Sequence, residues 1–178
     1  MDTEDARLVA DAVAGDRAAF AALVTRHYDR IFRVAWRILG NRAEAEDLAQ
    51  DVCATLGRRI RSFRGEAAFT TWLHRLVVNA ARDRLRREAA RGRAAMGWGD
   101  AEGLRRRDAA EREGEVAWLR ETLATLSPEL RETVALVLGE GLAHGEAAAA
   151  LGVSPGTVSW RMSEIRRRLR AQAEEERA

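Results

Sequence analysis

Residues 62–87, SFRGEAAFTTWLHRLVVNAARDRLRR, join a short loop containing Gly65 to a long amphipathic helical pattern. From Phe69 onward the apolar residues recur at steps of three and four, which is the period of one buried helix face. The opposite face carries four polar side chains at steps of four, three and four: Arg75, Asn79, Arg82 and Arg86. Because side chains at these spacings line up along an α-helix, the sequence predicts an exposed ridge of hydrogen-bond donors.

This ridge has two interpretations. A solvated helix face above a packed core is one, because runs of charge usually mark solvated faces. The other is a surface for a nucleic acid whose bases leave the stack. In that case guanidinium groups bind phosphate, while aromatic rings and an amide hold an unstacked base. The rest of the chain favours the second interpretation.

The composition limits the classes of protein to consider. The chain has 178 residues, 47% of them hydrophobic, which is enough for one large or two small domains. No run of about 18 apolar residues occurs and the N-terminal segment is acidic, so we expect a cytoplasmic protein without membrane insertion. Cys53 is the single cysteine and the three histidines have no ligand spacing, so the sequence predicts no metal site and no cofactor.

The net charge of +2 conceals two basic segments. Residues 58–93 hold eleven arginines against three acidic residues, and residues 161–170 hold five arginines against one. The remainder of the chain is therefore acidic. Two basic segments on an acidic chain predict two separate nucleic-acid contacts, with acidic surfaces left for protein partners.

Three helices are predicted before the central stretch, over residues 4–14, 16–39 and 41–56. Asp16 and Asn41 are the expected N-caps of the second and third. The outer face of the third carries Asp47, Gln50 and Asp51. This acidic face is either a solubilising surface or a docking surface for a basic partner.

The helical period is lost over residues 88–113, where four glycines predict a flexible linker, and it returns at Glu115. A short helix then ends at Leu151, Gly152 supplies a turn, and Ser154 followed by Pro155 starts a longer helix. This order is typical of a helix-turn-helix, whose second helix enters the major groove of DNA, although helical hairpins without DNA share the turn. The exposed side of the second helix offers eight side chains: Thr157, Ser159, Trp160, Arg161, Ser163, Glu164, Arg166 and Arg167.

Five motifs resemble those of a bacterial RNA polymerase sigma factor of the extracytoplasmic-function (ECF) group of the sigma-70 family. They are GDRAAFAALVTRHY, NRAEAEDLAQDV, the 62–87 stretch, LATLSPELRETVALV and LGVSPGTVSWRM, and together they cover nearly everything except the linker. The resemblance implies an all-α fold of two small helical domains. Sigma region 2 would occupy residues 1–90, the flexible linker residues 91–113, and the region 4 helix-turn-helix residues 114–178.

The resemblance also implies partners and residue roles. The helix with Asp47, Gln50 and Asp51 would bind the clamp helices of the largest subunit of core RNA polymerase, and the flap of the second-largest subunit is a further expected contact. The helix from Ser154 would bind the minus-35 element through the eight side chains named above. The minus-10 element would be recognised and melted by nine residues, with a flipped base held by the loop and Asn79: Ser62, Phe63, Arg64, Phe69, Trp72, Arg75, Asn79, Arg82 and Arg86. Such factors are commonly inhibited by an anti-sigma factor, and no small-molecule substrate is expected.

Several positions depart from the family pattern. Cys53 and Gly57 replace aromatic residues in the clamp-binding helix. Ala143 stands where a serine usually caps the first helix of the helix-turn-helix, so a normal cap is missing. In the second helix Glu164 stands where larger or basic groups are common, and it could accept a hydrogen bond from a cytosine amino group.

Two other classes of protein remain to be weighed. A stand-alone helix-turn-helix regulator with an N-terminal dimerisation or ligand domain explains the C-terminal half equally well, but it leaves the ridge around Asn79 without a role. A small helical enzyme has almost no support, because the sequence lacks a zinc-protease motif, a phosphate-binding loop and a nucleophile triad. We therefore predict a promoter-specificity subunit that is not an enzyme.

Overall fold

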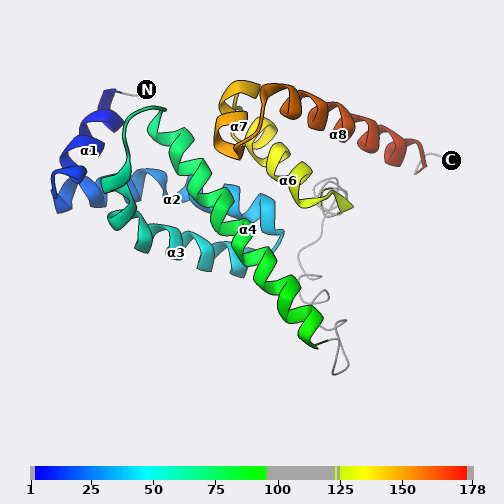
Figure 1. Cartoon of the computed structure of the whole chain (residues 1–178), viewed down its shortest axis with the longest axis horizontal. Helices are drawn as coiled ribbons and strands as arrows, with labels where there is room; N and C mark the ends of the chain where they lie inside the picture. Colours follow the sequence, from blue (N-terminus) through cyan, green and yellow to red (C-terminus); the bar gives the residue numbers. More distant parts are fainter. Residues whose placement is uncertain (1–2, 96–122, 124, 176–178) are drawn as a thin grey trace.

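The structure is a computed structural model that describes residues 3–95, 123 and 125–175 (Figure 1). The named elements are α1 (Thr3–Val13), α2 (Arg17–Leu39), α3 (Arg42–Arg59), the short 3-10 helix η1 (Ile60–Ser62), α4 (Phe69–Ala95), α6 (Pro128–Val134), the π-helical turn η3 (Ala135–Gly139), α7 (His144–Leu151) and α8 (Pro155–Glu175). No strand occurs in the described part of the chain. The predicted all-α fold with two helical domains is confirmed.

Local signals set the boundaries of the N-terminal helices. The carboxylate of Asp16 accepts hydrogen bonds from the backbone N–H groups of Ala18 and Ala19, at 2.7 and 3.2 Å, and so caps α2. Gly40 ends α2 with φ of +75°, a conformation that residues with a Cβ rarely adopt. The side chain of Asn41 then accepts from the N–H of Glu44 at 2.9 Å, which starts α3 as predicted.

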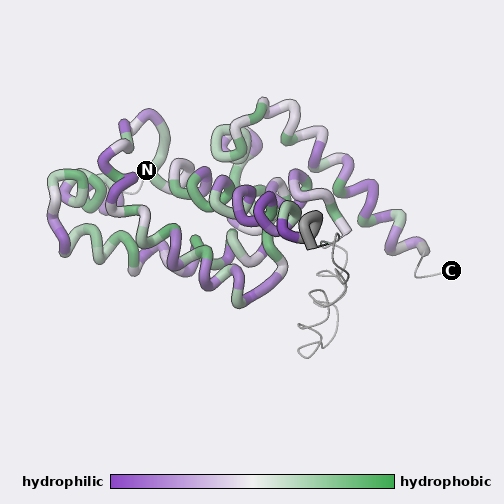
Figure 2. Tube along the Cα trace, turned by 60° about the horizontal axis from the view of Figure 1, so that its bottom comes forward, coloured by the Kyte–Doolittle hydropathy of each residue, from purple (hydrophilic) through white to green (hydrophobic). Residues whose placement is uncertain are grey.

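The N-terminal domain is a bundle in which α2 packs on α1, α3 and α4. Figure 2 shows hydrophobic and hydrophilic residues alternating along these helices. The core side chains are the predicted apolar stripes, including Leu23, Ile31, Ile38, Leu48, Leu56, Leu73 and Val77. Burial of one such side chain contributes about 1.5–3 kcal/mol, so these contacts fix which face of α4 is turned toward the core.

The C-terminal domain contains the predicted helix-turn-helix, formed by α7 and α8. Gly152 makes the turn with φ of +71° and donates its N–H to the carbonyl of Ala148 at 2.9 Å. The hydroxyl of Ser154 caps α8 by accepting from the N–H of Thr157 at 3.1 Å. Ala143 has no side-chain acceptor, but Glu146 accepts from the N–H of Ala143 at 3.0 Å, so one half of a capping box replaces the missing serine.

The two domains are in contact. Helix α7 packs on α4, while α6 and η3 pack on α2. Helix α4 continues to Ala95, beyond the expected start of the linker at residue 91, and the remaining linker residues, 96–113, lie outside the described residues. Among the described helices, none has a stretch both long and apolar enough to span a membrane.

Candidate nucleic-acid interface

Three aromatic rings form a cluster at the start of α4. The ring of Phe63 lies 5.8 Å from that of Phe69 and 5.4 Å from that of Trp72, and Phe69 lies 5.7 Å from Trp72. Phe63 and Trp72 are half-buried, whereas Phe69 is 1% exposed and also packs edge-on against His27. Phe69 was predicted to contact DNA, but its burial places it below the surface, where it supports the other two rings.

The loop before this cluster is open to solvent. Ser62 and Arg64 are exposed, and the hydroxyl of Ser62 donates to the carbonyl of Arg59 at 2.7 Å. Gly65 has φ of +72°, so a side chain at this position would strain the turn that leads into α4. The loop is therefore accessible to a ligand, and the rings of Phe63 and Trp72 that follow it are partly accessible.

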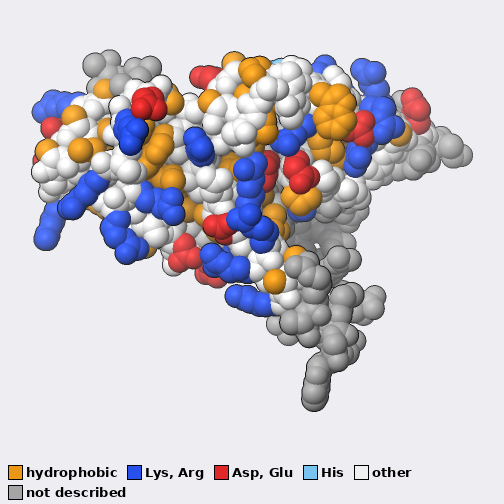
Figure 3. All heavy atoms as spheres, in the orientation of Figure 1, with side chains coloured by type: hydrophobic (Ala, Val, Ile, Leu, Met, Phe, Trp, Pro, Cys, Tyr) orange, Lys and Arg blue, Asp and Glu red, His pale blue; other side chains and the backbone are white. Residues whose placement is uncertain are grey.

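The predicted ridge on α4 is present, but it is divided. Arg75 and Asn79 are exposed, and Asn79 makes no hydrogen bond to any described side chain. Arg86 is exposed and pairs with Asp83 on the same helix. Arg82 is different, because its side chain is only 32% exposed and is bound to the other domain. Figure 3 shows basic side chains gathered along the C-terminal half of α4.

Arg82 is bound by a buried glutamate of α6. Its Nε donates to Oε1 of Glu132 and its Nη2 to Oε2, both at 2.7 Å, and Nη2 also lies 3.4 Å from the carbonyl of Leu151. The Glu132 side chain is 1% exposed. The hydrogen bonds to Glu132 raise the pKa of Arg82, so Arg82 stays protonated at any physiological pH.

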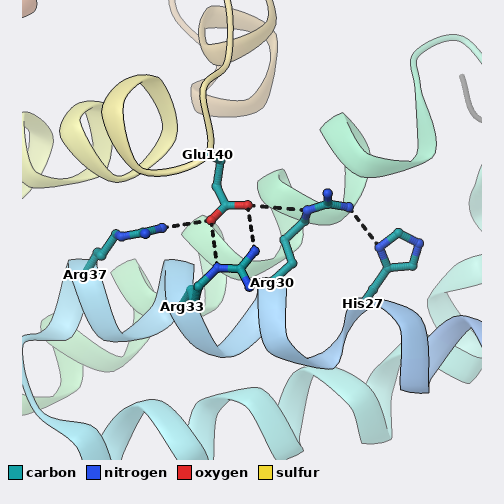
Figure 4. Close-up of polar contacts among 5 residues, drawn as sticks. All are labelled: His27, Arg30, Arg33, Arg37 and Glu140. Carbon is teal, nitrogen blue, oxygen red and sulfur yellow. Dashed lines mark hydrogen bonds and ion pairs between the residues drawn. The ribbon is translucent and has the colours of Figure 1, made fainter.

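A second acidic side chain of the C-terminal domain meets three arginines of α2 (Figure 4). Nη1 of Arg37 lies 2.8 Å from Oε1 of Glu140, while Arg30 and Arg33 approach the carboxylate to 3.4 Å. The Glu140 side chain is 5% exposed. Burial alone would raise the pKa of Glu140, but hydrogen bonds from Arg33 and Arg37 outweigh burial and hold that pKa below its usual value.

Gly139 leaves room for Arg37, the arginine nearest to Glu140. A Cβ at Gly139 would lie 2.7–2.9 Å from the guanidinium end of Arg37, so the absence of a side chain lets Arg37 pass along the backbone. Next to this contact, α4 buries His74, whose two ring nitrogens have no hydrogen-bond partner among the residues described. Burial lowers the pKa of His74 to about 4, and the positive charges of Arg30 and His27 act in the same direction, against Glu140 and Glu146.

Helix α8 presents most of its predicted side chains to solvent. Trp160 is 66% exposed, and Ser159, Ser163, Arg166 and Arg167 are exposed as well. Thr157 is half-buried against the Ser154 cap, at 2.9 Å between the hydroxyls, and Arg161 is half-buried with Nη1 3.5 Å from the Glu129 carbonyl. The hydroxyl of Ser159 bonds to Nδ1 of His144 at 2.9 Å, a contact from α7 that the sequence did not predict.

Glu164 is engaged within α8. Hydrogen bonds from Arg167 and Arg168, the shortest at 2.7 Å, lower the pKa of Glu164 to about 2. A contact between Glu164 and a cytosine amino group would therefore compete with these two arginines. The net positive charge of this turn of the helix remains available to phosphate.

The acidic face of α3 is exposed at Asp47, Gln50 and Asp51. Arg84 of α4 lies 3.4 Å from Asp47, so part of this face has a basic neighbour from another helix. Gly57, which departs from the family pattern, lies close to the ring of Phe20. A Cβ at this position would already be 3.4 Å from that ring, so little room is left for a larger side chain. Within the described ranges no group of three or more possible ligands could hold a metal ion.

Comparison with known proteins identifies both domains. Residues 23–91 match Sigma-70 region 2, and residues 117–169 match Sigma-70, region 4. The ECF RNA polymerase sigma factor SigM of Mycobacterium tuberculosis is 38% identical over 168 residues, which cover 94% of this chain and 84% of SigM. The chain belongs to the ECF group of the sigma-70 family. The resemblance indicated by the five motifs is thereby confirmed.

Solved structures of other sigma factors have the same fold. One is CnrH in complex with the cytosolic domain of CnrY, with a TM-score of 0.73, 28% identity, and coverage of 97% of this chain and 98% of CnrH. Another is RpoE of Bartonella quintana in complex with the anti-sigma factor NepR, with a TM-score of 0.73, 22% identity, and coverage of 87% and 96%. The second likeness, at this identity, concerns the fold alone.

The residues that sequence analysis missed are those that join region 2 to region 4 of this sigma factor. Arg30, Arg33 and Arg37 form a ridge on α2 with the same helical spacing as the ridge on α4, so they could have been noticed. Glu132 and Glu140 could not, because their partners lie 50 and more than 100 positions away in the sequence.

Proposed function

We propose that this sigma factor directs core RNA polymerase to promoters that carry a minus-35 and a minus-10 element, and that it promotes melting of the minus-10 element. The observation that carries this proposal is the exposed pair Arg75 and Asn79 on the helix that follows an open loop and two half-buried rings, in the same chain as a helix-turn-helix with a basic exposed face. The chain would contribute binding energy and no catalysis of its own, and it would act in the cytoplasm.

At the minus-10 element the loop and α4 would capture single-stranded DNA. Extruding one base costs a few kcal/mol, and stacking on Phe63 or Trp72 together with hydrogen bonds from the Asn79 amide would offset this cost. Arg75 and Arg86 would neutralise phosphates on either side, with Arg82 joining them once it is released from Glu132. Melting is then favoured because only the unpaired strand fits the site.

At the minus-35 element α8 would lie in the major groove. Ser159 and Ser163 can donate to or accept from base edges, and the exposed ring of Trp160 suits apolar contact with a thymine methyl group. Arg166 would contact phosphate, and Arg167 would do so once it exchanges its two hydrogen bonds to Glu164 for phosphate oxygens; both contacts would fix the register of the helix on the duplex. Thr157, Arg161 and Glu164 would act mainly by shaping this face, given their bonds within the domain.

The acidic face of α3, with Asp47, Gln50 and Asp51, would bind the clamp helices of the largest polymerase subunit, and region 4 would bind the flap of the second-largest. An anti-sigma factor would hold the chain inactive, as is common in this family. No cofactor enters this proposal.

Reconstituted transcription tests the proposal. Purified chain and core polymerase are incubated with fragmented DNA of the source genome, and the transcripts are sequenced. We expect start sites that depend on the chain and share two upstream elements. Copurification with core polymerase separates this function from that of a stand-alone regulator: DNA binding by the chain without any polymerase contact or any new start site would refute the proposal.

A further inference from the structure

A side-chain hydrogen bond joins the two helices of the helix-turn-helix. Nδ1 of His144, the first residue of α7, lies 2.9 Å from the hydroxyl oxygen of Ser159 on α8. Ser159 is exposed and His144 is half-buried, so the bond lies at the surface of the domain. A residue of the first helix thus controls the hydroxyl group of a residue on the face of α8 that is proposed to read DNA.

The direction of this hydrogen bond decides what Ser159 can offer to a base. A neutral imidazole has one nitrogen that accepts and one that donates, whereas a hydroxyl group can do either. If Nδ1 of His144 accepts, the single hydroxyl proton of Ser159 is used, and only oxygen lone pairs remain for DNA. If Nδ1 donates, the hydroxyl proton stays free, and Ser159 can bind acceptors as well as donors.

Two arguments favour Nδ1 as the acceptor. The neutral imidazole of a free histidine side chain carries its hydrogen mainly on Nε2, which leaves the lone pair on Nδ1. In addition, a helical serine can donate its hydroxyl proton to the carbonyl four residues earlier, as Ser163 does to the carbonyl of Ser159 at 3.1 Å. Between the described residues Ser159 and Pro155 no such bond is formed, so the imidazole of His144 is the acceptor within reach of this proton.

Ser163 offers the same kind of group one helical turn further along α8. Its hydroxyl proton is used on the carbonyl of Ser159, so its oxygen too is left as an acceptor. Both serines are exposed, and side chains four positions apart lie on the same helix face. In the major groove the hydrogen-bond donors are the amino groups of cytosine and adenine, whereas guanine and thymine present the acceptors O6 and O4. An acceptor on α8 therefore distinguishes amino bases from keto bases.

We propose that His144 determines specificity at the minus-35 element: its Nδ1 takes the hydroxyl proton of Ser159, so that the Ser159 oxygen binds only the exocyclic amino group of cytosine or adenine. This inference rests on the proposed function, because Ser159 meets base edges only if α8 lies in the major groove. His144 is a positioning residue, since it acts through Ser159 and need not touch the base. Guanine or thymine at the same place would set a carbonyl oxygen against the lone pairs of Ser159.

Nitrogen NMR tests the direction of the hydrogen bond. The chain has three histidines, so the full-length protein with nitrogen-15 in its histidine rings gives few signals, and those of His144 are identified by their loss in His144→Phe. At alkaline pH, where imidazole rings are neutral, we expect Nδ1 of His144 to be unprotonated and Nε2 to carry the hydrogen. A hydrogen on Nδ1 of the neutral ring would overturn the proposal.

Transcription from a promoter library tests the consequence for base preference. Core polymerase with the full chain transcribes a promoter recovered in the transcription experiment, in which the minus-35 element is randomised. The base pair read by Ser159 is the one whose preference is lost in Ser159→Ala. At this pair we expect the wild type to group adenine with cytosine, and guanine with thymine, on each strand. The two groups should differ about fivefold in transcript yield, as one net hydrogen bond requires. His144→Phe frees the hydroxyl proton of Ser159, so it should reduce the difference to less than about twofold at this pair alone.

Two further variants separate a specificity role from a structural one. In His144→Asn the amide oxygen can take the place of Nδ1, so this change should keep the fivefold difference. Ser163→Ala, the matched substitution one turn away, should change the preference at a different base pair only. Yields that fall equally on all templates in His144→Phe would mean that His144 only supports the fold, and would overturn the proposal.

The remaining outcomes distinguish this inference from the proposed function. Start sites that depend on the chain, combined with no base preference lost in Ser159→Ala, would overturn the role of His144 while the proposed function stands. The same holds for an undiminished amino–keto difference in His144→Phe. Absence of any start site that depends on a minus-35 element would refute the proposed function and the specificity role with it, whereas the NMR result on the free chain would stand.

Discussion

Asn79 provides the most direct test of the minus-10 site, through the substitution Asn79→Ala. The side chain is exposed on α4 and has no hydrogen bond to a described residue, so its loss should change the free energy of unfolding by less than about 0.5 kcal/mol. An amide that holds a base through two hydrogen bonds contributes about 1–3 kcal/mol. We therefore expect open-complex formation to fall about 5- to 150-fold.

Two assays separate the effect on melting from other effects. Permanganate reactivity of unpaired thymines measures the open complex, and fluorescence anisotropy measures binding to core polymerase, which should be unchanged. The chain offers a matched control, because Asn41 is its only other asparagine. Asn41→Ala removes the N-cap of α3 and should cost about 0.5–2 kcal/mol of stability without affecting melting by the folded protein. Equal losses of melting and core binding in Asn79→Ala would refute the base-holding role.

Three further predictions concern other parts of the chain. Replacing Arg166 and Arg167 by alanine should weaken promoter binding and reduce the slope of log K against log salt by up to about 2, as two lost phosphate contacts require; an unchanged slope would show that they do not reach phosphate. Asp47→Asn combined with Asp51→Asn should weaken core binding, measured by anisotropy, without changing the affinity for a labelled single strand covering the minus-10 element, and intact core binding would exclude α3 as the clamp contact. His74→Leu should stabilise the fold by about 1–3 kcal/mol, because two buried ring nitrogens without partners are removed. The neutral form of His74 is favoured in the fold. The free energy of unfolding of the wild type should therefore fall as the pH falls from about 6.5 through the folded pKa of about 4. Urea titrations should find this loss reduced in His74→Leu.

The parts of the fold that were predictable are those with local causes. Asp16, Gly40, Asn41 and Ser154 end or begin helices through contacts within three or four positions, and such contacts leave a signature in the sequence. The division into two helical domains followed from the loss and return of the helical period. The helix-turn-helix required only Gly152 between two apolar patterns.

The candidate site was less predictable, because its details depend on which surfaces meet in space. Periodicity placed Phe69 on the buried face of α4, whereas the family resemblance placed it in the minus-10 site; the packing of His27 and Phe63 around the ring agrees with the periodicity. Spacing alone likewise predicted exposed donors from Arg75 to Arg86. In the structure Asn79 is exposed, whereas Arg82 is bound by Glu132. The helical period could not predict this difference, because it carries no information on where α6 and α7 pack.

Asn79 and Arg82 differ in exposure, and this difference would affect how strongly the chain binds DNA in the absence of polymerase. A single turn of α4 separates the two side chains, yet one is exposed and the other is paired with a glutamate that is 1% exposed. The base-holding group would thus be ready at all times, whereas the neighbouring phosphate-binding group would be released only when region 4 moves. Because Arg75 and Arg86 stay exposed on either side, the pairing of Arg82 with Glu132 would remove one of three proposed backbone contacts and weaken strand capture without abolishing it.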